Sequence, residues 1–503
     1  MQISACAPGT QAEARTAGTA QNEGEVRMEW LSKVNAAVNG VVWGPIMLAL
    51  LIGTGIFLTI RCRWVQAGKF GHMWKNTIAT MFKRGEKGEA RRSDGKNVTP
   101  FQAVSTALAS TIGVGNVAGV AGAIAVGGPG AVFWMWISAF FGMCTKYAEI
   151  VLAVRFRQTA PDGTHYGGPM YYIEKGLHCK WLACIFALLG GLAAFGIGNA
   201  TQAAEISVAV NNLTGSGVDS SVVTAIVLAL IVGVVVIGGI KRISTVTSYM
   251  VPFMALFYIV VGVGVIVCNA GALPAAFGQI FASAFSFEAV GGGVFGYAIF
   301  VAMKNGFARG VFSNEAGLGS APIAHAASST KDPVKQGLWG IFEVFVDTII
   351  VCTITGLLVI LSGLYDGGLT GGALTAKAVE TLTGTAWGGH FIRIAILFFA
   401  LSTILGWEYY GEVCWGYLSK NNKFVQYAFK CVFIAVVFIG AASSSSSFLA
   451  DTSVLDLMWS IADTLNGMMA IPNLIALLCL SGVTVRLTKK YFRTGSSIEE
   501  GEQ

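Results

Sequence analysis

Residues 99–128 read TPFQAVSTALASTIGVGNVAGVAGAIAVGG, an apolar helix that is weakened in its middle by Gly113, Gly115, Gly119 and Gly122. An interruption there frees backbone groups that hydrocarbon cannot satisfy, so these groups need an ion or a ligand as partner. Exposed amides would attract an anionic carboxylate, and freed carbonyls would coordinate a cation. The same glycines are equally compatible with close packing of helices. A second interrupted segment favours the first interpretation.

That segment is residues 290–319, VGGGVFGYAIFVAMKNGFARGVFSNEAGLG, where an apolar run meets Lys304, Asn305, Gly306 and Arg309. The run has only about 15 residues, whereas an ordinary membrane-spanning helix needs about 20. We therefore expect the helix to break near these polar residues. The segment comes five predicted spans after the first one, and because five is odd, the chain enters it from the opposite side of the membrane. This is the pattern of an inverted repeat.

The composition is that of a polytopic membrane protein. Of 503 residues, 54% are hydrophobic and only 12% are charged, against roughly 25% in soluble proteins. The eleven expected spans cover residues 41–60, 101–126, 130–153, 181–210, 220–240, 243–267, 290–306, 337–363, 390–418, 424–442 and 455–487. We predict an all-α fold of leucine-transporter type, with one leading helix, a five-plus-five inverted repeat and two discontinuous helices. No catalytic residues are expected, because the histidines are dispersed and little chain remains for a soluble domain.

Charges in the loops predict the orientation. The loop 61–100 carries ten Lys and Arg against three acidic residues, which indicates the cytoplasmic side. The loops near 127–130, 211–220, 268–289 and 443–454 contain no Lys or Arg. The amino terminus is therefore expected outside and the carboxyl terminus inside.

The predicted organisation has seven parts. They are a disordered polar tail (1–27), an interfacial amphipathic helix (28–40), a leading span (41–60), a basic cytoplasmic loop (61–100), two five-helix repeats (101–267 and 290–487) and a cytoplasmic tail (488–503). Met28 is an alternative start residue.

Several stretches resemble the sodium:alanine symporter family, the alanine or glycine:cation symporters. They are GGPGAVFWMWISAFFG (127–142), RGVFSNEAGLGSAPIAHAAS (309–328), DTIIVCT (347–353) and STILGWEYYGE (402–412). The resemblance extends from about Met28 to about Arg493. It implies uptake of alanine or glycine together with sodium across a prokaryotic cell membrane, with sodium as coupling ion and no other cofactor.

The resemblance also implies a sodium site between the first broken helix and the ninth span. Its expected ligands are the hydroxyls of Thr403 and Ser402 and carbonyls of Ala109, Ile112 and Phe399 or a near neighbour. Hydroxyls inside an apolar helix otherwise usually bond the carbonyl one turn back. Both interpretations stay open at this point.

The amino acid is expected to bind beside the sodium. Amides from Gly113 through Val114 and Gly115 to Asn116 would take its carboxylate, and carbonyls near Asn305 and Gly306 its ammonium group. Gln202 or Asn199 would hydrogen-bond its polar end, although both side chains are equally suited to bridging helices. Trp407 would cap the pocket or anchor the helix at the interface.

Charged residues inside the spans have open roles. Asp347 is expected to bind a second cation, to receive the substrate ammonium, or to pair with Arg309, and Glu205 would add a proton-sensitive group. Lys146 and Glu149 are spaced to form a local ion pair. Proton-coupled symport is the nearest alternative function, followed by a passive channel. The preference among alanine, glycine, serine and D-isomers stays open, as does the oligomeric state.

Overall fold

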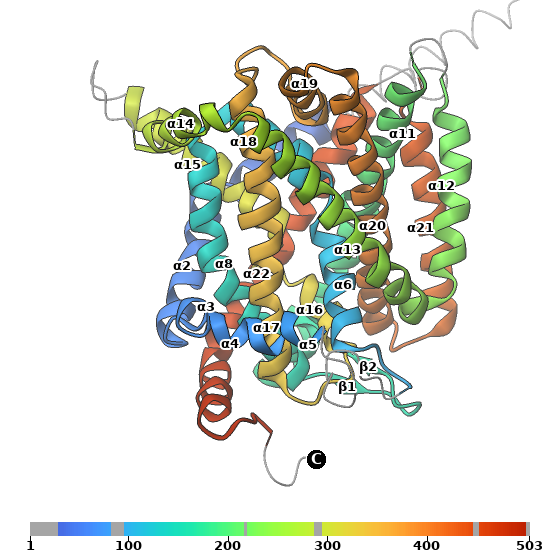
Figure 1. The fold of residues 1–503 in the computed structure, drawn as a ribbon. Helices are drawn as coiled ribbons and strands as arrows, with labels where there is room; N and C mark the ends of the chain where they lie inside the picture. The colour runs from blue at the N-terminus through green and yellow to red at the C-terminus, as the bar shows by residue number, and fades with distance from the viewer. Residues whose placement is uncertain (1–28, 82–94, 216–218, 286–293, 446–451, 499–503) are drawn as a thin grey trace, which may run out of the picture.

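The protein is a bundle of long helices with one short β-hairpin at one end (Figure 1). The computed structural model describes residues 29–81, 95–215, 219–285, 294–445 and 452–498. The predicted tail 1–27 therefore lies outside the described residues. Residues 29–42 are helical and lead into α2 (Pro45–Arg61). The hairpin pairs β1 (Gln158–Thr159) with β2 (His165–Tyr166) in antiparallel register.

Short helices and the first helical set follow α2. They are α3 (Val65–Gly68), α4 (Phe70–Asn76), α5 (Ile78–Met81), α6 (Pro100–Thr111), η2 (Gly115–Gly119), α7 (Val120–Gly127), α8 (Gly130–Arg155), α9 (Pro169–Leu177), α10 (Lys180–Phe195), η3 (Gly196–Ala200), α11 (Thr201–Thr214), α12 (Ser221–Val236) and α13 (Gly239–Cys268).

Two short elements, η4 (Ala270–Ala272) and α14 (Leu273–Phe285), connect this set to the second one. The second set consists of α15 (Val294–Asn314), α16 (Ala321–Ala326), α17 (Pro333–Val344), η5 (Phe345–Cys352), α18 (Thr353–Ser362), α19 (Gly371–Thr383), α20 (Ala386–Leu418), α21 (Lys423–Ala442) and α22 (Thr452–Thr494). In Figure 1, α14 and α19 lie at one end of the bundle, and α3, α4, α5, α16 and the hairpin lie at the other.

The first broken helix has the predicted interruption. A capping box starts α6, since the Thr99 side chain accepts from the Gln102 amide and the Gln102 side chain accepts from the Thr99 amide. The helix ends at Thr111, and the following half, η2 with α7, is bent from it by 49°. The break therefore falls at residues 112–114, where the glycines begin.

The second broken helix interrupts later than predicted. Asn305 and Gly306 lie inside α15, which is continuous to Asn314, so the expected break near them is wrong. Gly306 instead allows close packing, because a Cβ there would collide with the carbonyl oxygen of Ala131. The unwound stretch is residues 315–320, where Glu315 (φ 55°), Gly317 (φ 95°) and Gly319 (φ 86°) adopt left-handed conformations. Those backbone angles cannot continue a right-handed helix.

The number of spans depends on the criterion. Among the described residues, eight helices are long and apolar enough to cross a membrane, or nine if the bent pair is one span. The expected count of eleven stays a prediction. Two helices that we did not predict, α14 and α19, lie between the longer ones. Helix α19 covers the first broken helix, since the Thr375 hydroxyl donates to the Val117 carbonyl (3.1 Å).

Candidate functional site

The predicted cation ligands converge at the first break. The Thr403 hydroxyl lies 3.2 Å from the carbonyl oxygen of Ala109 and 3.0 Å from that of Phe399. The Ser402 hydroxyl lies 2.8 Å from the Phe399 oxygen and 3.5 Å from the Ile112 oxygen. All five residues are buried. Each hydroxyl thus bonds the Phe399 carbonyl of its own helix, as hydroxyls in apolar helices usually do. Each also faces a carbonyl of the first broken helix, as a cation site requires.

Gly113 allows this close approach. A Cβ at this position would lie 2.5 Å from the Thr403 hydroxyl oxygen and 3.6 Å from Oε1 of Gln202. The Gln202 amide donates to the Ile197 carbonyl (3.0 Å), while its Oε1 is buried and has no hydrogen-bond partner among the described residues. An unused acceptor therefore faces the break from α11.

Asn199 takes the helix-bridging role. It lies in η3, and its amide donates to the Phe433 carbonyl of α21 at 2.8 Å. Of the two side chains predicted near the substrate, the structure brings Gln202 to the break and directs the Asn199 amide to α21. Asn199 lies in the π-helical turn η3 and Gln202 in the following helix α11, and their amides donate to different neighbours.

The amides expected for a carboxylate are partly occupied. Oδ1 of Asn116 accepts from the Gly113 amide (2.9 Å), and its Nδ2 donates to Oδ1 of Asp347 (2.7 Å). The Thr355 hydroxyl donates to the Asn116 carbonyl (2.8 Å). The backbone amide of Asn116 also donates to the Gly113 carbonyl (3.1 Å), so Val114 and Gly115 hold the two amides of the predicted set that lie between the engaged amides of Gly113 and Asn116.

Asp347 connects the two broken helices. Besides Asn116 of the first, its carboxylate accepts from the Ser313 hydroxyl of α15 (2.8 Å) and from the Thr348 hydroxyl (2.7 Å). All these groups are buried. Neutral donors thus surround a carboxylate in the π-helical segment η5, a type of turn that is frequent at functional sites.

Within the described residues no ion pair joins Arg309 to Asp347, so this structure does not show that alternative. The Arg309 guanidinium lies over the Phe312 ring, 5.2 Å from the ring centroid, and its charge acts on Asp463 of α22. Asp463 in turn accepts from the Asn39 amide (3.1 Å). Because the true break follows Asn314, Arg309 lies inside a continuous helix, away from the unwound stretch.

The second break is held by residues that we assigned to a local ion pair. The Lys146 ammonium donates to the Asn314 carbonyl (2.6 Å) and pairs with Glu343 of α17 (2.9 Å). Glu149 instead accepts from the Gly317 amide (3.0 Å) and from Asn473 of α22 (2.5 Å). The predicted Lys146–Glu149 pair is therefore wrong, because both side chains turn to the unwound backbone.

Further buried polar groups extend this network. Glu343 contacts Nε2 of His325 (3.1 Å), and Nδ1 of that ring lies 2.8 Å from the Gln336 amide. Glu343 is fully buried. Sequence reasoning could have found this network from its charges within apolar spans.

Trp407 connects α20 to the second break. Its indole donates to Oε1 of Glu315 (3.0 Å), and the side chain packs on Gly198, where a Cβ would collide with it. The ring is 3% exposed, so it does not lie at a membrane interface. Trp407 thus closes the space between Gly198 and the unwound stretch, one turn beyond Thr403.

Three of the predicted site residues, Asn305, Gly306 and Glu205, lie apart from the polar groups at the two breaks. The Asn305 amide bonds the Val301 carbonyl of its own helix (2.8 Å), and Gly306 packs on α8. Glu205 lies farther along α11, beside Gly372 of α19. Glu408 is a residue that we did not single out, although it is fully buried and neither carboxylate oxygen has a hydrogen-bond partner among the described residues.

Comparison with known proteins identifies the family of this chain. The model of the family described as "Sodium:alanine symporter family" matches residues 28–502. The chain belongs to this family. A relative named sodium/alanine symporter AgcS, from Methanococcus maripaludis, is 48% identical over 472 residues, which cover 92% of this chain and 98% of the relative. The protein is therefore a multi-pass membrane transporter and not an enzyme.

Solved structures establish the fold. The crystal structure of MhsT in complex with L-phenylalanine matches with a TM-score of 0.55 at 12% identity, covering 78% of this chain and 99% of that one. A Na+-coupled sialic acid symporter in its substrate-bound outward-open state matches with a TM-score of 0.52 at 13% identity, covering 91% and 93%. The transporter thus has the leucine-transporter-type fold that the sequence predicts.

Proposed function

We propose that the transporter imports small neutral amino acids, alanine or glycine, together with sodium by alternating access. The observation that carries this proposal is the approach of Thr403 and Ser402 to the carbonyls of the first break. The membrane would be the prokaryotic cell membrane, with the amino terminus outside and the carboxyl terminus in the cytoplasm, as the loop charges favour.

The cation would be held by neutral oxygens. The two hydroxyls and the carbonyls of Ala109, Ile112 and Phe399 supply five hard ligands, and sodium needs about five or six. The name of the relative AgcS, a sodium/alanine symporter, supports this ion.

The substrate would lie between the two breaks. Its carboxylate would meet the amides of Val114 and Gly115, and Oε1 of Gln202 would accept from its ammonium group. Trp407 would close the pocket toward Gly198 and leave room for a small side chain only. Serine and D-isomers stay within the same size class.

The surroundings of Asp347 favour a second cation site in this proposal. A carboxylate that contacts both broken helices, with two hydroxyls within 2.8 Å, offers charged and neutral oxygens to an ion. The alternative is proton coupling, in which Asp347 or Glu205 would carry the proton. Asp347 lies in η5 and Glu205 in α11.

Uptake into liposomes tests the coupling. Purified protein is reconstituted, and radiolabelled alanine uptake is measured with an inward sodium gradient, with potassium in its place, and with an inward proton gradient alone. We expect uptake only with sodium. Uptake driven by protons alone would discard the sodium site, and the absence of alanine uptake under all three conditions would contradict the substrate class.

A further inference from the structure

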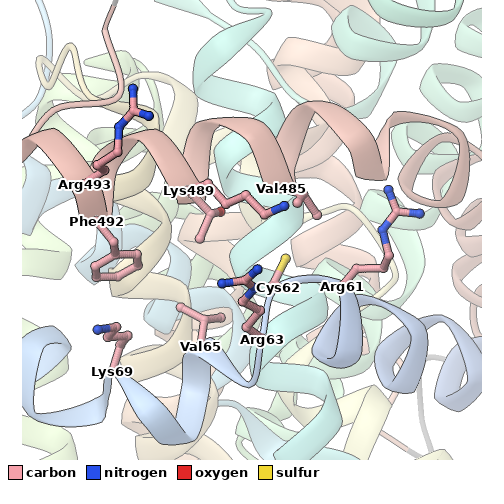
Figure 2. Close-up of a pocket in the computed structure, with 10 residues that line it drawn as sticks. Arg61, Cys62, Arg63, Val65, Lys69, Val485, Lys489, Phe492 and Arg493 are labelled. Carbon is pink, nitrogen blue, oxygen red and sulfur yellow. The ribbon is translucent and has the colours of Figure 1, made fainter.

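A basic pocket lies where the end of α2 meets the end of α22 (Figure 2). Its volume is about 350 Å³. Five of its lining residues are basic: Arg61, Arg63, Lys69, Lys489 and Arg493. The others are Cys62, Val65, Val485, Thr488 and Phe492, so no carboxylate lines it.

These positive charges are not neutralised by described residues. Within the described part of the chain, none of the five makes an ion pair with a carboxylate. Two of them contact aromatic rings instead, with Lys69 at 5.0 Å from the Phe492 centroid and Arg61 at 5.4 Å from that of Phe57. Like charges repel when they share a concave site, so the pocket favours an anion.

The side chains reach the pocket from both helices. Figure 2 shows Arg63 extending from the turn after α2 toward Lys489 of α22, while Arg493 points away from α3. Arg63 and Trp64 hold left-handed conformations (φ 58° and 56°), which reverse the chain at the end of α2. A neighbouring pocket of about 700 Å³ shares Arg63 and Lys489 with this one.

The exposed face of α22 locates the pocket relative to the hydrocarbon. Ile471 and Ile475 are 40% and 41% exposed, and Cys479 follows them on the same face. Two to three turns later the exposed residues are Arg486 and Lys489. The change from apolar to basic marks the boundary between acyl chains and head groups.

The same change occurs on α2. Its exposed residues are apolar through Ile60, which is 60% exposed, and become basic at Arg61 and Arg63. Trp64 is 49% exposed, as expected for an aromatic side chain at the membrane interface. Both helices thus enter the head-group region at the pocket.

We propose that this pocket binds the phosphate of an anionic phospholipid, with the acyl chains along the exposed apolar residues of α2 and α22. The lipid belongs to the leaflet on the side where α22 ends. The excess of Lys and Arg on one face explains the presence of charges, but not their convergence from two distant segments on one acid-free pocket. Basic pockets between membrane helices are suited to such head groups. The phosphate screens the repulsion and joins the leading helix to the last helix of the core.

Lipid binding to the purified full-length protein tests the proposal. Native mass spectrometry and thermal unfolding in detergent are measured with added phosphatidylglycerol, phosphatidylcholine or inorganic phosphate. The variant is Arg61→Gln/Arg63→Gln/Lys489→Gln. The control, Lys331→Gln/Lys420→Gln/Lys423→Gln, removes three exposed charges elsewhere on the chain.

We expect phosphatidylglycerol, and not phosphatidylcholine, to bind and to raise the unfolding temperature of the wild type and of the control. The pocket variant should bind it about a hundredfold more weakly, since each basic residue contributes about 1 kcal/mol to such binding. Equal stabilisation by inorganic phosphate would assign the pocket to a free anion and overturn the lipid. Unchanged phosphatidylglycerol binding by the pocket variant would overturn the site.

Discussion

Lys146 of α8 and Glu343 of α17 form an ion pair of 2.9 Å in which neither side chain is exposed. The same ammonium group donates to the Asn314 carbonyl, at the end of α15, and Glu343 also contacts His325 of α16. One buried cation therefore connects both sides of the second break to the helix that carries Asp347. The Asn314 carbonyl at the start of the unwound stretch thus accepts from this ammonium group, as a backbone group freed inside hydrocarbon requires a partner.

Removing the lysine alone should be costly. Lys146→Met leaves the Glu343 carboxylate without its cation in a buried site, which is expected to cost about 3–5 kcal/mol of unfolding free energy. The double variant Lys146→Met/Glu343→Met should recover much of that loss. Thermal unfolding of the purified protein measures both. The exposed pair Lys33–Glu29 provides the control, since Lys33→Met should change little. Equal effects of the two single variants would contradict the role of the buried pair.

Thr403→Ala should weaken sodium activation. The variant removes a hydroxyl that faces the Ala109 carbonyl, and we expect the sodium concentration for half-maximal alanine uptake to rise about tenfold, since one ligand is worth about 1.4 kcal/mol. Thr54→Ala removes a buried hydroxyl from α2, outside the site, and serves as control. Unchanged sodium activation in a well-folded Thr403→Ala protein would contradict the assignment.

Gly113→Ala should act on the same site from the other side. The added Cβ would lie 2.5 Å from the Thr403 hydroxyl, so either the hydroxyl or the break must move, and sodium-dependent uptake should fall at least about tenfold. Gly122→Ala is the matched control, because a Cβ there meets nothing within 4 Å. Uptake by both variants is measured at saturating alanine across a sodium series. Similar losses of uptake in the two variants would contradict the site, because they would show that this helix does not tolerate an added methyl group at either position.

Asp347→Asn should change the ion stoichiometry. If Asp347 holds a second cation, the neutral amide removes its charge, and the ratio of ²²Na to alanine taken up should fall by about one. The amide also turns a donor toward Ser313 or Thr348, so thermal unfolding is measured in parallel. A variant that folds and keeps the wild-type ratio would show that the carboxylate only positions the two broken helices.

The sequence predicted what depends on local backbone chemistry. Four glycines in an apolar run predicted a break in the middle of the first broken helix, which the structure places at residues 112–114, and the family resemblance implied that the hydroxyls of Ser402 and Thr403 face it. Hydrocarbon cannot satisfy free backbone groups, so an interruption in such a helix is visible in the residues themselves. The same argument, with the family motifs, predicted the fold class.

The tertiary structure decided which polar groups meet. The second break was predicted near Asn305 but lies after Asn314. Gly306 packs closely on α8, and the residues with left-handed backbone angles come later in the chain. Lys146 pairs with Glu343, almost 200 residues away in the sequence, and not with the predicted partner Glu149. Helical spacing predicts which side chains share a face. It does not determine which partner of another helix lies opposite, since a buried charge takes whichever opposite charge the packing of the helices brings within reach.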